Sequence, residues 1–259
     1  MTGSPGIAVV RPPATSVAEG ITTFIEREPI DLDLARRQWQ HYVEAFEAHG
    51  WTIEQVGVDD DAPDSVFVED AAFVHRGRAV ACRPGALERR REVEPVARRL
   101  AELGLDVQRV EGEATIDGGD VLKVGDDVYV GRGGRTNPAG IEAVATLLHP
   151  VGARVHAVPI DAALHLKSAV TALPDGSVVG WGPVTPSDGL PPVLEMPEEA
   201  GAHVVDLGGG AVLMASGSER SAEIVRRRGY TPVIVDIGEF IKLEGCVTCL
   251  SIRIRELPA

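Results

Sequence analysis

The chain has 259 residues, of which 44% are hydrophobic and 25% charged, and its formal net charge is −14 at pH 7. This length can bury a substantial hydrophobic core in one or two domains. The negative charge argues against nucleic acid as a partner, because nucleic acid requires a basic face. It is compatible with a small cationic substrate, and also with an acidic surface that only maintains solubility.

The start of the chain and its cysteine content predict a cytoplasmic protein. The segment MTGSPGIAVVRPP has no basic region followed by a long apolar run, so we expect no signal peptide. No apolar stretch approaches the ~20 residues needed to span a bilayer, so we expect no membrane association. With only 3 cysteines and no export signal, a disulfide framework is not expected.

Along the chain, a strand that ends in a turn is repeatedly followed by a helical pattern and a further strand. The strands are short, rich in Val and Ile, and bounded by Gly or Pro, and the helical stretches carry apolar residues at spacings of three and four. Helices are predicted over 33–50, 87–104, 138–152 and within 211–229. A Pro-rich connection is predicted over 182–201. The repeating units fall at 6–58, 77–112, 120–160, 169–201 and 211–237.

Five similar units of roughly 50 residues predict a propeller or solenoid built from supersecondary repeats. The competing fold is a doubly wound parallel sheet. Hairpin signals such as VGDDVYV and LPDGSVV disfavour it, since a parallel sheet lacks them. No G-x-G-x-x-G follows a strand, so no dinucleotide site is predicted. The pattern therefore favours an α/β fold with five ββαβ-type units around a central channel, formed by residues 1–259 as one domain.

Two acidic clusters lie beside predicted strands. In PDSVFVEDAAF, the carboxylates of Asp64, Glu69 and Asp70 surround an apolar strand, where a buried carboxylate needs a partner. They could equally be surface carboxylates at a strand rim. In ATIDGGDVLKVG, Asp117 and Asp120 flank two glycines, a pattern that is typical of a turn.

Two further segments carry reactive side chains near apolar residues. His165 in DAALHLKSAV could be a catalyst, although a core histidine with its hydrogen bonds satisfied is the commoner case. Cys246 and Cys249 in EGCVTCLSIRIREL are predicted to lie in a buried strand, where positions i and i+3 point to opposite faces. On that geometry they would share neither a metal nor a disulfide, and no second C-x-x-C supplies zinc ligands. One cysteine would then be inert core, and the other could be a nucleophile.

The segments PDSVFVED, RPGALERR, DGGDVL, GRGGRTN, LHLKS and GCVTCLS occur in the order found in the dimethylarginine dimethylaminohydrolases. The chain resembles this family over essentially its whole length, from VVRPPATSVAEGI to CLSIRI. Individually these motifs are weak, but six in order are specific. The family belongs to the guanidine-modifying superfamily, so the resemblance implies a five-bladed α/β propeller, the fold class that the repeats also predict.

The resemblance implies a catalytic set and a mechanism. Cys249 matches the nucleophile, His165 the general acid and base, and Asp117 the carboxylate that orients the histidine. The implied reaction converts asymmetric dimethylarginine or monomethylarginine to citrulline and the methylated amine through a covalent thiouronium on Cys249. We expect no metal and no organic cofactor, and a monomer or homodimer.

The resemblance also implies substrate-binding residues. The expected roles are carboxylates around the guanidinium, an aromatic wall, two arginines for the α-carboxylate, a backbone carbonyl for the α-amine, and a lid residue. The matching carboxylates are Asp64, Glu69 and Asp70, and Phe67 matches the aromatic wall. Arg89 and Arg135 match the two arginines, the backbone carbonyl is that of Leu243, and Ile21 matches the lid residue. Ile21 stands where the family has leucine, and Cys246 matches no residue with a known role.

Two other functions fit parts of the sequence. A deiminase or amidinotransferase of the same fold would act on free arginine or another guanidine. However, deiminases of arginine and amidinotransferases have longer chains, and a decarboxylated substrate would not need both Arg89 and Arg135. A non-catalytic propeller would lack the Cys–His–carboxylate set that this chain has.

Overall fold

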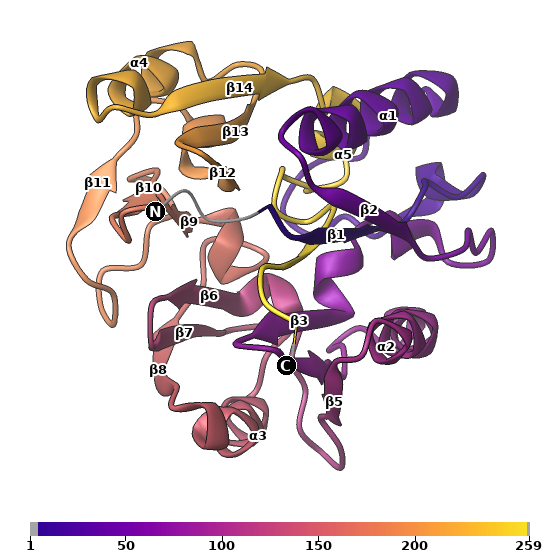
Figure 1. Cartoon of the computed structure of the whole chain (residues 1–259). Helices are drawn as coiled ribbons and strands as arrows, with labels where there is room; N and C mark the ends of the chain where they lie inside the picture. The colour runs from indigo at the N-terminus through magenta and orange to yellow at the C-terminus, as the bar shows by residue number, and fades with distance from the viewer. Residues whose placement is uncertain (1–4, 258–259) are drawn as a thin grey trace.

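The structure is a computed structural model, described here for residues 5–257. Within that range, fifteen strands form five three-stranded sheets that are arranged in a ring (Figure 1). The strands are β1 (Ile7–Val10), β2 (Thr52–Gln55), β3 (Ala72–His75), β4 (Arg78–Ala81), β5 (Asp106–Arg109), β6 (Val121–Val124), β7 (Asp127–Arg132), β8 (Arg154–Pro159), β9 (Val170–Ala172), β10 (Val178–Gly180), β11 (Val193–Glu195), β12 (Val204–Gly208), β13 (Ala211–Ala215), β14 (Thr231–Val235) and β15 (Ile252–Ile254).

All five sheets have the same topology. The central strand pairs antiparallel with an inner strand and parallel with an outer strand, as β4 does with β3 and β5. The sheet orders are β15-β1-β2, β3-β4-β5, β6-β7-β8, β9-β10-β11 and β12-β13-β14. Three units follow the predicted ββαβ order along the chain, the unit β9-β10-β11 lacks the helix, and the unit β15-β1-β2 takes its inner strand from the end of the chain. The predicted fold class, a five-unit α/β propeller, is confirmed.

Helices make the crossovers in four of the five units and lie on the outside of the ring (Figure 1). They are α1 (Leu32–Ala48), α2 (Val93–Glu102), α3 (Pro138–Leu148) and α4 (Glu219–Arg227), with a short α5 (Gly238–Ile241) after β14. Helix α1 begins where the Asp31 side chain accepts from the Leu34 amide. Helix α3 begins at Pro138, after Asn137 caps it in the same way. Between β10 and β11 the predicted Pro-rich connection replaces a helix.

The last described strand closes the ring. β15 pairs antiparallel with β1, with Ile254 opposite Ile7, so the end of the chain supplies the inner strand of the unit that its beginning starts. Buried aromatic side chains pack beside this sheet, where the rings of Tyr42, Phe46 and Trp51 contact one another in sequence. The repeats predicted the five units, but not which strands would meet to close them.

Short 3₁₀ helices connect the larger elements, and four of them lead directly into inner strands. They are η1 (Val17–Glu19), η2 (Pro63–Val66), η3 (Val68–Asp70), η4 (Glu88–Glu92), η5 (Gly118–Asp120), η6 (His149–Val151), η7 (Leu166–Ser168) and η8 (Glu199–Ala202). The segments η3, η5, η7 and η8 end just before β3, β6, β9 and β12. The first three therefore bring the acidic clusters and the histidine motif to the same end of the ring.

The prediction of an apolar strand through PDSVFVEDAAF is wrong for its first part. Residues 63–70 form η2 and η3, and β3 begins only at Ala72. Pro63 starts η2, because its fixed φ suits a first helical turn and its missing amide hydrogen costs nothing there.

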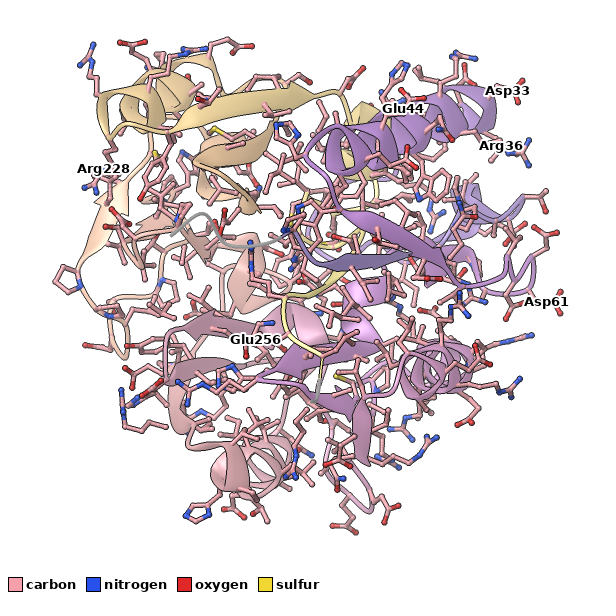
Figure 2. The ribbon with its side chains drawn as sticks, in the orientation of Figure 1. Asp33, Arg36, Glu44, Asp61, Arg228 and Glu256 are labelled. Carbon is pink, nitrogen blue, oxygen red and sulfur yellow. The ribbon has the colours of Figure 1, made fainter. Side chains whose placement is uncertain are left out.

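The charged residues lie mainly on the outside, as Asp33, Arg36 and Glu44 on α1 show in Figure 2. No helix within residues 5–257 is both long and apolar enough to span a bilayer.

Candidate active site

Nine of the eleven predicted site residues line one pocket at the end of the ring where the inner strands begin. The pocket is lined by Ile21, Asp64, Phe67, Asp70, Arg89, Arg135, Leu164, His165, Leu243, Glu244, Gly245 and Cys249. The two predicted residues outside this lining are Asp117, which lies behind His165, and Glu69, which faces the channel.

The segment that begins at Ile21 closes this pocket. The Ile21 amide donates to Asp64, and the amides of Thr23, Phe24 and Ile25 all donate to one carboxylate oxygen of Glu244. The enclosed cavity is about 20 Å³, room for about one water molecule. An arginine-sized ligand therefore requires the segment 21–25 to move, which supports the predicted lid.

We predict that Glu244→Ala loosens this lid. Three amides lose their common acceptor, so hydrogen exchange over residues 21–25 should accelerate, and KM should rise by roughly 3- to 30-fold with a smaller change in kcat. Hydrogen-exchange mass spectrometry and steady-state kinetics would measure both effects. Glu26→Ala, an exposed change in the adjacent segment, is the matched control. Equal hydrogen exchange and equal KM in the Glu244 variant and wild type would contradict the role of Glu244 in holding the lid closed.

His165 is held by the predicted carboxylate. Its Nε2 lies 3.0 Å from Asp117 Oδ2, and both side chains are buried. The other oxygen of Asp117 accepts from the Gly85 amide at 2.9 Å, which fixes the carboxylate. Asp120 holds the same loop, because its carboxylate accepts from the Leu166 amide. This is the arrangement by which a carboxylate orients a catalytic imidazole and stabilises its charged form.

Asp70 and Arg89 form a buried ion pair beside His165. Arg89 Nη1 lies 2.6 Å from Asp70 Oδ2, and Nη2 lies 2.8 Å from Glu92. The other carboxylate oxygen of Asp70, Oδ1, accepts a hydrogen bond from the Gly119 amide and lies 3.7 Å from His165 Nδ1. Because most Arg89 donors already have partners, this arginine chiefly anchors Asp70.

Arg135 is the arginine with a donor left for a ligand. Its Nη1 is buried and has no hydrogen-bond partner within residues 5–257, and Asp117 lies 4.0 Å away. Phe67 and Leu243 are buried and line the pocket. These positions agree with an anion contact at Arg135 and an apolar wall at Phe67.

Glu69 faces away from the pocket, towards the channel. Its Oε1 pairs with Lys167 Nζ at 2.5 Å and with Arg253, whereas Oε2 is buried without a hydrogen-bond partner in the described range. Glu69 and Asp70 are neighbours on a 3₁₀ helix, where successive side chains point about 120° apart. Of the three predicted guanidinium carboxylates, Asp64 and Asp70 therefore line the pocket, whereas Glu69 does not.

Cys246 and Cys249 are close together, contrary to the prediction. Residues 246–250 form a turn, in which the Cys249 amide donates to the Cys246 carbonyl at 3.1 Å, and β15 starts only at Ile252. The two Sγ atoms are 3.3 Å apart, and Cys246 Sγ is 3.2 Å from Thr248 Oγ1. The prediction that both cysteines lie in a strand, with their sulfurs on opposite faces, is therefore wrong. A turn brings positions i and i+3 to the same side.

The environment of Cys249 favours a protonated resting thiol. The hydrogen bond with Cys246 and burial, followed by the charges of Cys246, Asp70 and Glu69, raise the pKa of Cys249 well above its ordinary value. Burial lowers the pKa of His165, but Asp70, Asp117 and Asp120 outweigh it and raise that pKa to about 9. At neutral pH the imidazole is therefore charged and can act as an acid. Its positive charge faces the carboxylates of both Asp70 and Asp117.

The raised pKa of the Cys249 thiol predicts how its alkylation depends on pH. Only the thiolate reacts with iodoacetamide, so labelling of Cys249 should rise through a midpoint above the usual ~8.5. Cys246→Ala removes the first cause of the shift, so its midpoint should move to lower pH. Labelling rates mapped by fragment mass spectrometry would show this. A midpoint below neutral in wild type would contradict the protonated resting state.

Solved structures of other proteins share this ring of five sheets. A cysteine-to-serine mutant of the Pseudomonas aeruginosa enzyme in complex with citrulline superposes with a TM-score of 0.88 at 29% identity, covering 96% of this chain and 99% of that one. An adduct of a dimethylarginine dimethylaminohydrolase with S-methyl-L-thiocitrulline superposes with a TM-score of 0.87 at 28% identity, covering 96% and 100%. The ring and its pocket therefore define a pentein of the guanidine-modifying superfamily.

Sequence similarity specifies the family. The chain is 56% identical over 251 residues to the N(G),N(G)-dimethylarginine dimethylaminohydrolase of Streptomyces coelicolor, covering 96% of this chain and 97% of that protein. It is 31% identical over 250 residues to the P. aeruginosa enzyme, covering 95% and 98%. No family model matches. The chain belongs to the dimethylarginine dimethylaminohydrolase family.

Three pocket residues were missed by the sequence analysis. Leu164 adds an apolar wall, Glu244 holds the lid, and Gly245 leaves room for the Phe67 ring, which a Cβ there would meet at 2.3 Å. Glu244 is one of 39 acidic residues, and nothing in its local pattern marks it. In the structure its backbone has φ 62°, which is uncommon for a residue other than glycine.

Proposed function

We propose that this protein hydrolyses asymmetric dimethylarginine and monomethylarginine to citrulline and dimethylamine or methylamine. The observation that carries the proposal is the convergence of Cys249, His165 and the carboxylate of Asp70 in one closed pocket. Membership of the family supports it, as do relatives whose names state this activity and a structure that contains citrulline.

The pocket offers one contact for each part of such a substrate. Arg135, with its unpartnered Nη1, binds the α-carboxylate. Arg89, the second predicted arginine, lines the same pocket, but its donors are paired with Asp70 and Glu92. The Leu243 carbonyl accepts from the α-amine, and Phe67 covers the side chain. Asp64 and Asp70 face the guanidinium and keep it protonated and planar through charge-assisted hydrogen bonds.

The first chemical step is attack of the Cys249 thiolate on the guanidinium carbon. Arrival of a cation lowers the thiol pKa, because it offsets the field of Asp70 and Glu69. His165 donates its proton to the departing dimethylamine, which leaves a covalent thiouronium on Cys249. Asp117 keeps the imidazole aligned throughout.

Hydrolysis of that intermediate completes the reaction. His165, now neutral, takes a proton from water, which attacks the thiouronium carbon, and citrulline leaves as the thiol is restored. The closed segment 21–25 excludes further water while the intermediate exists.

Substrate selectivity is the test of this proposal. Free arginine presents two N–H donors where a dimethylated nitrogen presents none, and each buried unpaired donor costs about 1–3 kcal/mol. Each buried methyl carbon contributes ~0.8 kcal/mol. We expect kcat/KM for mono- and asymmetric dimethylarginine to exceed that for arginine by more than about 100-fold. Symmetric dimethylarginine should also be poor, because its second methyl group blocks a nitrogen that the carboxylates need as a donor.

The measurement is kcat/KM for all four compounds under one condition, with citrulline as the readout. Arginine turned over as well as the methylated forms would identify a deiminase of the same fold. The N-terminal domain of the arginine dihydrolase ArgZ shares this fold, with a TM-score of 0.86 at 20% identity.

A further inference from the structure

The pair Cys246 and Cys249 has a chemistry that hydrolysis does not use. Their sulfur atoms are 3.3 Å apart, and a disulfide has an S–S bond of about 2.05 Å, so the sulfurs need to approach by only about 1.3 Å. Cys249 lines the substrate pocket, whereas Cys246 does not, and both are buried. An oxidant that enters by the substrate's route therefore reaches Cys249 first, with Cys246 directly behind it.

Charge favours Cys246 as the second thiol of such a pair. The hydrogen bond from Cys249, against the effect of burial, lowers the pKa of Cys246 to about 5, and Thr248 and His203 contribute in the same direction. A thiol with a lowered pKa is largely thiolate at neutral pH, and the thiolate is the form that attacks an oxidised sulfur.

We propose that Cys246 is a resolving cysteine, which forms a reversible disulfide with Cys249 when a peroxide oxidises the latter. The proton of Cys249 first passes to Cys246 along the hydrogen bond between the two sulfurs. The Cys249 thiolate then attacks the peroxide O–O bond and becomes a sulfenic acid, releasing water or an alcohol, while Cys246 loses that proton as it attacks in turn. Cys246 then attacks Cys249 Sγ, the S–S bond forms, and the sulfenic oxygen leaves as a second water molecule. Two thiols lose two electrons and one peroxide gains them. A dithiol reductant reverses the bond.

The consequence rests on the proposed role of Cys249 as nucleophile. The disulfide removes the attacking thiol and stops turnover. It also protects Cys249 from further oxidation to sulfinic acid, which dithiothreitol does not reverse.

Hydrogen peroxide treatment of the full chain tests this inference. In wild type, we expect the titratable thiols of the denatured protein to fall from 3 to 1, since the chain has 3 cysteines. The intact mass should fall by about 2 Da, and activity should be lost and then restored by dithiothreitol. Cys82→Ser removes the third cysteine, which belongs to another hydrophobic cluster, and should behave identically, with two thiols falling to none.

Cys246→Ser is the decisive variant. At the same peroxide dose, its activity, normalised to its own untreated value, should be lost without recovery in dithiothreitol, and its mass should rise by about 32 Da. Recovery equal to that of wild type, or disulfide found only between chains, would overturn the inference. A disulfide that forms within the chain while turnover persists would instead overturn Cys249 as nucleophile, so the two failures can be told apart.

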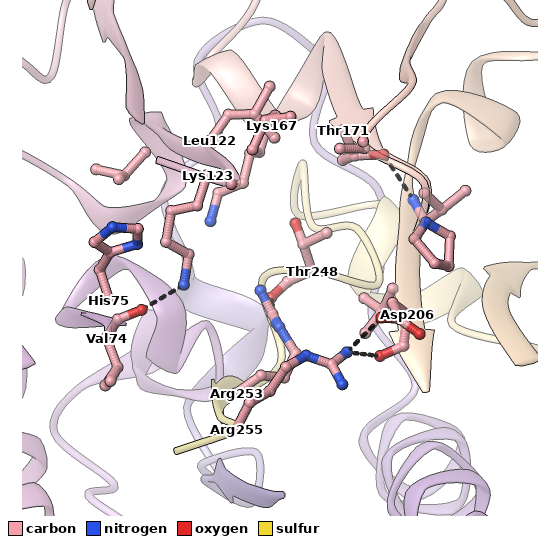
Figure 3. Close-up of a pocket in the computed structure, with 18 of the residues that line it drawn as sticks. Val74, His75, Leu122, Lys123, Lys167, Thr171, Asp206, Thr248, Arg253 and Arg255 are labelled. Carbon is pink, nitrogen blue, oxygen red and sulfur yellow. Dashed lines mark hydrogen bonds and ion pairs between the residues drawn. The ribbon is translucent and has the colours of Figure 1, made fainter. Parts of the chain in front are cut away.

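A second feature is a larger cavity of about 490 Å³ along the axis of the ring. Residues from all five inner strands line it, at the end away from the candidate active site: His75 on β3, Lys123 on β6, Thr171 on β9, Asp206 on β12 and Arg253 on β15. Figure 3 shows Lys123, Lys167 and Arg253 extending into this space from different elements.

Positive charge is in excess in the inner part of this cavity. Glu69 alone pairs with both Lys167 and Arg253. Lys123 Nζ donates to the Val74 carbonyl at 2.6 Å and lies within 4.0 Å of no carboxylate in the range 5–257. Burial first, and then the positive charges of Arg253 and Lys167, lower the pKa of Lys123 to about 7.

We infer that this cavity binds a small anion with two or more negative charges, carried by phosphate or by several carboxylates. Its volume lies in the range of ordinary small-molecule sites. At the outer end, Asp206 is already paired with Arg255 at 2.9 Å, so it does not oppose an anion bound deeper. Only Glu256 remains as a second lining carboxylate, and it is exposed near the middle of the face in Figure 2.

Isothermal titration calorimetry at pH 6.5 and fixed ionic strength tests this site. Pyrophosphate and citrate are the two probes, and they distinguish phosphate from carboxylate recognition. We expect saturable binding of at least one, with Kd below about 1 mM, weakened at least about tenfold by Lys123→Gln. Lys242→Gln, which removes a lysine paired with Glu239 outside the cavity, should leave Kd unchanged. Absence of saturable heat from both probes, or equal weakening in the two variants, would overturn the inference.

Discussion

Cys249→Ser is expected to reduce citrulline formation by at least about 1,000-fold while the ring remains folded. A serine hydroxyl is far less acidic than a thiol, so no nucleophile forms beside His165 at neutral pH. The substitution replaces sulfur by the smaller oxygen and needs no backbone movement. Citrulline release under saturating asymmetric dimethylarginine would measure the loss, and circular dichroism would confirm the fold.

The other two cysteines provide matched controls for this result. Cys82 is buried in a different hydrophobic cluster, with Phe73 and Ile116, so Cys82→Ser should retain turnover at some cost in stability. Cys246→Ala should stay within about tenfold of wild type, because Cys246 contacts Cys249 but does not line the pocket. Equal loss in the Cys246 and Cys249 variants would contradict Cys249 as the single nucleophile.

Local pattern was sufficient to predict the five units, because four of them consist of a hairpin and a crossover that are adjacent in sequence, and the remaining one still has its crossover from β1 to β2. It was insufficient for closure of the ring. β1 and β15 lie at opposite ends of the chain, and nothing in IAVV or IRI specifies its partner. Pairing across such a separation depends on the whole ring being assembled, which a local signal does not encode.

The order of motifs predicted which residues gather, but not which way each one points. Glu69 and Asp70 are adjacent carboxylates in one motif, and on a 3₁₀ helix they diverge towards the channel and the pocket. The same limitation explains the cysteines. Period-two reasoning holds only in a strand, and the turn at 246–250 brings the two sulfurs together. Arg89 is a further case, since its partners Asp70 and Glu92 are revealed only by the packed structure.

Asp70→Asn is expected to reduce kcat/KM for asymmetric dimethylarginine by roughly 30- to 1,000-fold. The amide keeps the shape of the carboxylate but removes a charge that faces the guanidinium in a buried site, a loss of about 2–4 kcal/mol in transition-state binding. Burial lowers the pKa of His165, and among the groups that raise this pKa Asp70 contributes most. Its removal should therefore move the pH at which His165 loses its proton downwards from about 9.

The pH profile distinguishes this role from simple loss of structure. If Asp70 only anchored Arg89, the variant would melt at a lower temperature, yet its remaining activity would keep the wild-type pH dependence. If Asp70 faces both substrate and imidazole, kcat/KM falls at every pH and its alkaline limb moves to lower pH, because a neutral neighbour no longer stabilises the imidazolium. Asp61→Asn, a change at an exposed carboxylate, should alter neither quantity. Activity of the Asp70 variant within threefold of wild type would place Asp70 outside the reacting centre.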